Sequence, residues 1–273
     1  MTHTRPTQGL SPILHRLTDA DRPGSLVVFP DFGGNTIYAR SLVSSLASTL
    51  SCYALRLPAD LITEPDAQSL EVVAGRFAEE ILSHGLHPPL QLLGFSFAGA
   101  LAYETGRQLD LRGARPDMVW ILDLPLRKPL GLREFLKHPV HHAKAIRRHL
   151  RLNWRRLILR KQDPSVLSAY GIWRIDLSRH PESYRTVMRF LYEAFRLYRP
   201  APSSAPATVL RASGSHYRDW LGDSLGWSDM VRGPVTVHTV PGDHLSMLND
   251  PENASVIARR IAHSVNQETH RDT

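Results

Sequence analysis

Residues 91–109 read QLLGFSFAGALAYETGRQL, an apolar run that stops at a turn of small residues and continues with helical periodicity. In the turn, Ser96 stands between Gly94 and Ala98, with Gly99 directly behind. A nucleophilic serine at a strand-to-helix elbow usually occupies the pattern G-x-S-x-G, because strand and helix pass close together there. Ala98 keeps a small side chain at the second glycine position. The stretch therefore predicts either a nucleophile elbow or a helix with Ser96 as its N-cap.

Further apolar runs of strand length lie on both sides of this stretch. Strands are expected at residues 25–30, 52–58, 90–95, 118–124, 207–212 and 235–240, and helices at 37–50, 70–86, 98–111, 182–198 and 253–267. Continuously apolar strands that alternate with amphipathic helices are typical of a parallel sheet covered on both faces. The predicted fold class is therefore α/β, with a mostly parallel sheet flanked by helices in a single domain spanning residues 1–273.

The alternation of strands and helices breaks at approximately residues 126–200. Helical periodicity continues there without a convincing strand, so we expect a helical insertion. Within it, residues 133–161 combine a Leu/Ile/Trp stripe with a face of arginines. At the other end of the chain, residues 1–12 are expected to form a flexible tail.

The net charge of +7 is concentrated in the insertion. Residues 126–161 contain 12 Lys and Arg but a single acid, Glu134, a local balance of +11 that leaves −4 for the rest of the chain. Such a segment is compatible with three roles: a basic face exposed to solvent, a binding surface for an acidic protein, or a binding surface for an anionic membrane. No nucleic-acid-binding module is recognisable, so we expect no nucleic-acid partner.

The remaining bulk features indicate a cytoplasmic protein. Cys52 is the only cysteine, which excludes an intramolecular disulfide, and no signal peptide or membrane span is evident. The chain begins with its own methionine and has no carrier domain, which suggests a free-standing enzyme. The histidines of the insertion lack accompanying cysteines or paired carboxylates, so no metal site is expected at His138, His141, His142 and His149.

A serine nucleophile needs a histidine base and a carboxylate that orients it. His244 comes after the last predicted strand, which is where the histidine base lies in α/β enzymes whose catalytic residues occur along the chain in the order Ser, Asp, His. Taken alone, His244 would be interpreted as a loop histidine. Asp123 ends the strand after that of Ser96, which places it on the same rim of the sheet. Asp219 and Asp223 are the alternative acids, although they lie seven or more residues beyond their strand.

Acyl transfer also needs two backbone N–H groups aimed at the developing oxyanion. One is expected from Phe97, the residue after the nucleophile. The other is expected from the loop after the first core strand, at Asp31, where Gly33 and Gly34 let the main chain curl. The loop lacks the lysine of a P-loop and the spacing of a dinucleotide fingerprint, which disfavours a phosphate site.

Four stretches together resemble the thioesterase domains of nonribosomal peptide and polyketide synthases. They are FPDFGGNTIYARSLVSSL, GFSFAGALAYETGRQL, WILDLPLRKP and VPGDHLSML, in the order and spacing of that family. The resemblance implies an α/β-hydrolase fold whose insertion is a helical lid over the site. It also implies a catalytic triad of Ser96, Asp123 and His244, and an oxyanion hole built from the N–H groups of Asp31 and Phe97.

The resemblance implies a serine thioesterase that accepts an acyl, peptidyl or polyketide chain from the 4′-phosphopantetheine arm of a carrier protein. Release then goes to water or, by transfer or cyclisation, to another nucleophile, and no other cofactor is needed. Carriers of this kind are acidic, so the basic lid is expected to bind the acyl or peptidyl carrier protein through Arg147, Arg148, Arg151, Arg155 and Arg156. The position of Asp123 resembles chain-releasing more than editing thioesterases.

Two other functions are compatible with parts of the pattern. A membrane-associated serine esterase or lipase would keep the triad and use the basic lid on anionic lipid. A catalytically silent carrier-binding module is disfavoured because all three triad residues are present. Two positions depart from the family pattern: Ala98 replaces a glycine, and Asp31 brings a carboxylate into the oxyanion loop.

Overall fold

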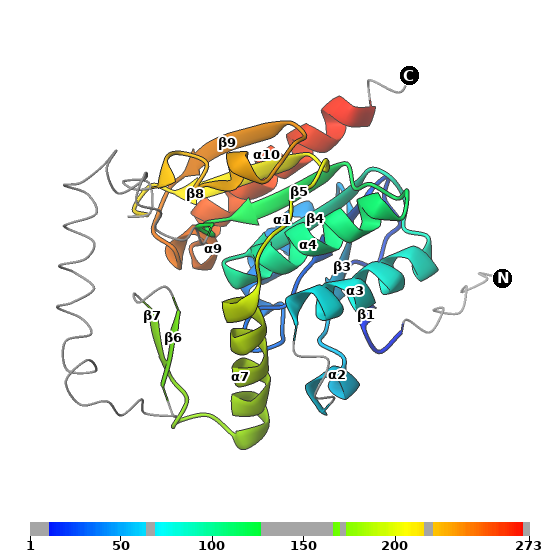
Figure 1. The fold of residues 1–273 in the computed structure, drawn as a ribbon. Helices are drawn as coiled ribbons and strands as arrows, with labels where there is room; N and C mark the ends of the chain where they lie inside the picture. Colours follow the sequence, from blue (N-terminus) through cyan, green and yellow to red (C-terminus); the bar gives the residue numbers. More distant parts are fainter. Residues whose placement is uncertain (1–10, 64–68, 127–165, 170–172, 216–220, 270–273) are drawn as a thin grey trace.

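The computed structural model describes residues 11–63, 69–126, 166–169, 173–215 and 221–269 of the chain (Figure 1). Its centre is a seven-stranded sheet in the order β1-β3-β2-β4-β5-β8-β9. Only β1 runs antiparallel to its neighbour; the other pairs are parallel. The strands are β1 (Leu14–Arg16), β2 (Ser25–Val28), β3 (Ser51–Leu55), β4 (Leu90–Phe95), β5 (Met118–Leu122), β8 (Ala207–Ala212) and β9 (Val235–Val240).

Helices cover both faces of this sheet (Figure 1). On one face lie α3 (Leu70–His84) and α4 (Phe97–Leu111), and on the other α1 (Arg40–Leu46), α9 (Ser246–Asn249) and α10 (Pro251–Thr269). Because successive side chains of a strand point to opposite faces, neighbours such as Leu92 and Leu93 enter different cores. This two-faced burial is why the central strands are largely apolar, and it confirms the predicted fold class.

The observed elements agree with most of the predicted ones. Strands β4, β8 and β9 have the predicted bounds, and α3 stops at His84 because Gly85 takes a left-handed conformation that ends the helix. The helix expected at residues 37–50 is a 3-10 turn, η1 (Ile37–Ala39), followed by α1, and the sequence did not indicate the short elements β1, α2 (Ala59–Thr63) and η3 (Trp227–Asp229). Within the described ranges no helix combines the length and the apolar character that a membrane span requires.

The expectation of an insertion without strands is wrong. Strands β6 (Val166–Ala169) and β7 (Trp173–Asp176) form an antiparallel pair of their own, outside the main sheet. A two-stranded unit buries too little for an alternating pattern to stand out in the sequence. The helix expected at residues 133–161, and with it the five arginines from Arg147 to Arg156, lies outside the described residues.

Helix α7 (Glu182–Leu197) is the part of the insertion that reaches the core, as predicted from its periodicity. Figure 1 shows it beside the β6–β7 pair and below the end of the sheet. Its buried face consists of Met188, Phe190, Leu191, Ala194 and Phe195. Alanine, leucine and aromatic side chains at three- and four-residue spacing therefore bind this helix to the α3–α4 side of the domain.

Candidate active site

Ser96 is held at a sharp elbow between β4 and α4. Its N–H donates to the carbonyl oxygen of Leu122 at 2.8 Å, which ties the elbow to the end of β5. Its φ angle is 53°, a conformation that costs a non-glycine residue of the order of 1–3 kcal/mol and is concentrated at functional sites. The side chain makes no helix cap, so the interpretation of Ser96 as an N-cap serine is not supported.

The elbow accepts Ala98 but needs Gly94. A Cβ atom on Gly94 would overlap the backbone of Ala98 and Gly99, where the helix turns back over the strand. The methyl group of Ala98 is itself fully buried in the core. The departure from G-x-S-x-G therefore falls at the position that has room for a methyl group.

Asp123 lies directly after β5, with its side chain fully buried. Its φ angle is 46°, so it shares with Ser96 a backbone conformation that is rare outside glycine. Its N–H donates to the carbonyl oxygen of Leu210 at 2.8 Å, and its Oδ1 accepts the N–H of Ala212 at 3.1 Å. These bonds to β8 leave Oδ2 to face His244.

His244 joins the other two residues. It stands between β9 and α9 in a turn in which Asp243 Oδ1 accepts the N–H groups of Leu245 and Ser246 at 3.0 and 2.8 Å. Its Nδ1 lies 2.9 Å from Oδ2 of Asp123, and its Nε2 lies 3.0 Å from Oγ of Ser96. An ionised carboxylate only accepts, so Nδ1 carries the proton and Nε2 is free to accept that of Ser96.

The carboxylate of Asp243 is not a rival for the acid position. The N–H of Ser246, its hydroxyl and the N–H of Leu245 hold the pKa of this exposed side chain below its usual value. Its oxygens are therefore committed to the turn that carries His244. The structure brings Ser96, Asp123 and His244 together through side chains from three separate loops at one rim of the sheet.

The alternative acid Asp223 is placed differently. Its side chain is 62% exposed and pairs with Arg211 at 3.4 Å. Asp219 lies outside the described residues, as do the four histidines of the insertion. Among the described residues, no group of three or more His, Cys, Asp or Glu side chains could hold a metal ion.

The oxyanion loop corrects the expectation for Asp31. The N–H of Asp31 donates to the carbonyl oxygen of Asn35 at 2.8 Å, so it is not available to an oxyanion. The carboxylate folds back on the loop, where Oδ1 accepts the N–H groups of Gly33 at 2.8 Å and Asn35 at 3.3 Å. Burial raises the pKa of this side chain, against the opposing effect of those two bonds. Asp31 therefore shapes the loop through its side chain.

Two N–H groups remain at the expected place. Phe97 is the first residue of α4, and a first-turn N–H has no partner within its own helix. Phe32 follows Asp31 in the loop, and among the described residues its N–H has no acceptor. The geometry therefore offers the N–H groups of Phe32 and Phe97 as the donor pair. Phe97 is the expected donor, and Phe32 takes the place of the expected Asp31.

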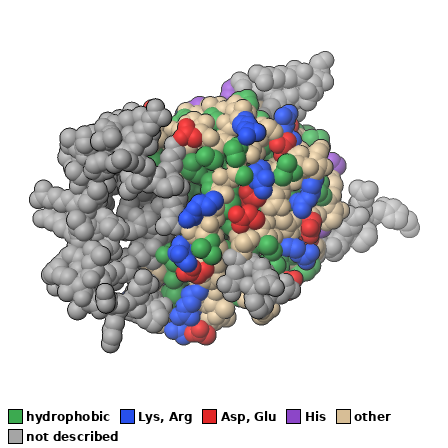
Figure 2. Space-filling view, viewed as in Figure 1, with side chains coloured by type: hydrophobic (Ala, Val, Ile, Leu, Met, Phe, Trp, Pro, Cys, Tyr) green, Lys and Arg blue, Asp and Glu red, His purple; other side chains and the backbone are tan. Residues whose placement is uncertain are grey.

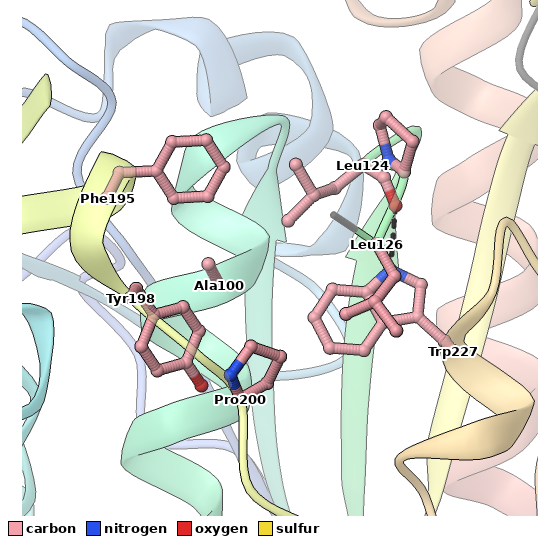
Figure 3. A pocket seen from close by; sticks show the side chains of 8 residues that line it. Ala100, Leu124, Leu126, Phe195, Tyr198, Pro200 and Trp227 are labelled. Carbon is pink, nitrogen blue, oxygen red and sulfur yellow. Dashed lines mark hydrogen bonds between the residues drawn. The ribbon is translucent and has the colours of Figure 1, made fainter. Parts of the chain in front are cut away.

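An apolar pocket lies about one helical turn along α4 from the nucleophile (Figure 3). The polar atoms around it are engaged: Trp227 Nε1 donates to the carbonyl oxygen of Leu124 at 2.7 Å, and the hydroxyl of Tyr198 donates to the buried carboxylate of Glu104 at 3.1 Å. What remains is an apolar lining, contributed by Ala100, Leu124, Pro125, Leu126, Phe195, Tyr198, Pro200 and Trp227.

Comparison with known proteins finds similar domains. Residues 25–130 match the family model for the thioesterase domain. The Vlm2 thioesterase domain superposes with a TM-score of 0.61 at 22% identity, covering 93% of this chain and 97% of that one. The NocB thioesterase domain from the nocardicin cluster gives 0.60 at 18% identity, covering 92% and 99%. The chain has an α/β-hydrolase fold similar to that of these thioesterase domains. The resemblance to synthase thioesterases that the sequence indicates is thereby confirmed.

Curated relatives of this thioesterase fold are synthase proteins. The spectinabilin polyketide synthase system protein NorC of Streptomyces orinoci is 26% identical over 238 residues, which is 86% of this chain and 9% of the relative. The phenyloxazoline synthase MbtB of Mycobacterium tuberculosis is 32% identical over 112 residues, 40% of this chain and 8% of the relative. The chain thus spans less than a tenth of the length of these two relatives.

Proposed function

We propose that this chain is a serine thioesterase that takes an acyl, peptidyl or polyketide chain from the phosphopantetheine thioester of a carrier protein onto Ser96 and then releases it. One observation carries the proposal: Ser96, His244 and Asp123 form a continuous hydrogen-bonded chain at the rim of a thioesterase-type fold. Positioned in this way, the hydroxyl gains a base and the base gains a fixed tautomer.

In the first step, Nε2 of His244 takes the proton of Ser96 as Oγ attacks the carbonyl carbon of the thioester. The carbonyl oxygen becomes an oxyanion, which the N–H groups of Phe97 and Phe32 stabilise. The carbon–sulfur bond then breaks, and the thiol of the phosphopantetheine arm leaves with the proton from His244. The acyl chain is now an ester of Ser96.

In the second step, water or a hydroxyl or amine of the substrate attacks the ester. His244 takes the proton of this nucleophile and returns it to Oγ of Ser96 as the ester bond breaks. Water yields a free acid, and an internal nucleophile yields a macrocycle. The side chains around the small pocket near the elbow are apolar, so they offer an acyl chain no polar partner.

Intact-mass measurement tests the proposal directly. After incubation with pantetheine thioesters of increasing acyl length, the protein is expected to gain the mass of one acyl group, and the gain should be lost in Ser96→Ala. An acyl mass that persists in Ser96→Ala would place the nucleophile elsewhere.

The carrier-protein partner is proposed on charge. On the face shown in Figure 2, basic and acidic side chains are interspersed. The described residues also form exposed ion pairs such as Arg76–Glu79 and Arg196–Glu193. The excess of +11 belongs to residues 126–161, most of which lie outside the described residues. A concentrated charge of this kind steers an oppositely charged partner and raises its association rate.

Charge reversal tests this partner. Replacing Arg147, Arg148 and Arg151 by glutamate is expected to lower kcat/KM for a carrier-bound thioester by about 10- to 100-fold at low ionic strength. Activity on a pantetheine thioester of the same acyl group should not change. Raising the salt from about 50 to 500 mM should remove most of the difference, because the Debye length shrinks to a few ångströms.

A matched control replaces three exposed arginines, Arg22, Arg115 and Arg232, by glutamate. They precede strands β2, β5 and β9, so they lie at the N-terminal ends of the strands, opposite the site. This variant changes the net charge equally and should keep the carrier reaction. Equal losses on both substrates in the first variant would contradict a carrier-binding role. Loss of binding to anionic vesicles with an unchanged carrier reaction would favour the membrane-associated esterase.

A further inference from the structure

The two proposed oxyanion donors come from distant parts of the chain, yet their side chains are in contact. The ring of Phe32, from the loop after β2, stacks on the ring of Phe97, at the start of α4, with centroids 4.2 Å apart and an interplanar angle of 17°. An oxyanion hole works because its donors are held in place before charge develops. The stacked rings therefore connect the two residues whose N–H groups must stay at a fixed distance from each other to bind an oxyanion.

A third ring from the insertion completes the contact. Phe195 of α7 meets Phe97 edge-on at 5.3 Å and 88°, and it meets Phe32 at 5.9 Å and 73°. Edge-to-face packing at these separations is a favoured arrangement of aromatic rings. Phe97 and Phe195 are 2% and 8% exposed and Phe32 is partly buried, so the three rings form a largely buried cluster.

Phe195 also faces the apolar pocket. Its ring lies on the wall opposite Leu124 in Figure 3, and it lines the pocket together with Tyr198 from the end of the same helix. The ring of Phe195 therefore contacts the rings of Phe32 and Phe97 and also contributes to the apolar lining of this small pocket.

From these contacts we infer that Phe195 is a positioning residue, through which helix α7 holds the N–H groups of Phe32 and Phe97 at the separation an oxyanion requires. The inference rests on the proposed function. It deepens that proposal by linking the insertion to the chemical step. A misplacement of about 1 Å in a catalytic group can cost about 100-fold in rate. The cluster should therefore act on kcat and leave substrate binding nearly unchanged.

The test compares two alanine variants of the same helix. Phe195→Ala removes the third ring, and Phe190→Ala removes a phenylalanine of α7 that is 7% exposed in the same core but makes no ring contact with Phe32 or Phe97 in the described structure. Both lose the same side chain from a buried face, so they should lose similar thermal stability. We expect kcat of Phe195→Ala to fall about 10- to 100-fold below that of Phe190→Ala, with KM within about 3-fold.

Two further measurements separate positioning from bulk packing. Phe195→Leu should recover part of kcat, because it refills most of the volume against the stacked pair. A trifluoromethyl ketone with the acyl group of the substrate forms a tetrahedral adduct on a serine, and its affinity should fall with kcat across the variants. Phe32→Leu, which removes one ring of the stack itself, should show the same split if Phe195→Ala does not fold.

The outcomes are distinct. Equal kcat in Phe195→Ala and Phe190→Ala would overturn the inference, and so would a rise in KM at unchanged kcat, which would make Phe195 only a pocket wall. Both results would leave the proposed function standing, since wild-type protein would still be acylated on Ser96. A wild-type protein that no thioester acylates would overturn the proposed function, and this inference with it.

Discussion

Ser96→Ala is expected to lower thioester turnover by about 10⁴-fold or more while leaving the fold unchanged. The substitution removes only Oγ, the atom 3.0 Å from Nε2 of His244. The donors and the substrate pocket would remain, which accounts for a small residual rate. Steady-state kinetics with a pantetheine thioester, beside a thermal unfolding curve, measures both effects.

A serine at the same rim supplies the control. Ser213 follows β8, is exposed, and donates its hydroxyl to the carbonyl oxygen of Gly242 at 3.2 Å. Ser213→Ala should keep turnover within about 3-fold, and both variants should change the free energy of unfolding by no more than about 0.5 kcal/mol. A loss below about 100-fold in Ser96→Ala would remove Ser96 from the role of nucleophile.

The fold was predictable wherever an element buries a regular face. Strand β4 and helix α3 follow directly from runs of apolar residues and from helical spacing, because both are packed into the core along their whole length. The three-residue strand β1 and the pair β6–β7 carry too few residues for a period to show. Strand β1 pairs with β3, which is distant in the sequence, and β6 and β7 pair with each other outside the main sheet.

The candidate site divides in the same way. Ser96 and Asp123 directly follow strands β4 and β5, and His244 lies in the loop after β9, so topology alone predicts that they meet at one rim. The shift of the oxyanion donor from Asp31 to Phe32 was harder to foresee. It depends on the hydrogen bond that the Asp31 carboxylate accepts from the N–H of Gly33 in its own loop. Aspartate side chains commonly accept such bonds in turns, so the sequence FPDFGG could have indicated it.

The aromatic cluster had no comparable signal. Phe195 is one of several apolar residues on α7, and periodicity shows that the helix has a buried face without showing what that face touches. Its contacts with Phe32 and Phe97 bring together residues from three separate regions of the chain. Only the packed structure shows that an ordinary core position lies against the proposed oxyanion donors.

Asp123→Asn is the second change for which a large loss is expected, about 10³- to 10⁴-fold in kcat. The structural reason lies in the second oxygen of the carboxylate. Oδ1 accepts the N–H of Ala212 at 3.1 Å, so an asparagine must keep its carbonyl oxygen there and turn its NH₂ group toward His244. That group donates to Nδ1, which moves the ring proton to Nε2, and Nε2 can then no longer accept the proton of Ser96.

Asp223→Asn is the matched control, since it makes the same substitution at the acid that follows the next strand. The side chain of Asp223 is 62% exposed and pairs with Arg211 at 3.4 Å, far less buried than Asp123, so kcat should stay within about 3-fold. Asp219→Asn should be equally mild. If Asp223→Asn or Asp219→Asn were instead the crippling change, the acid would belong to the later strand and the geometry at Asp123 would be structural. The reason for expecting otherwise is that Asp123 combines full burial with a direct 2.9 Å contact to Nδ1 of His244.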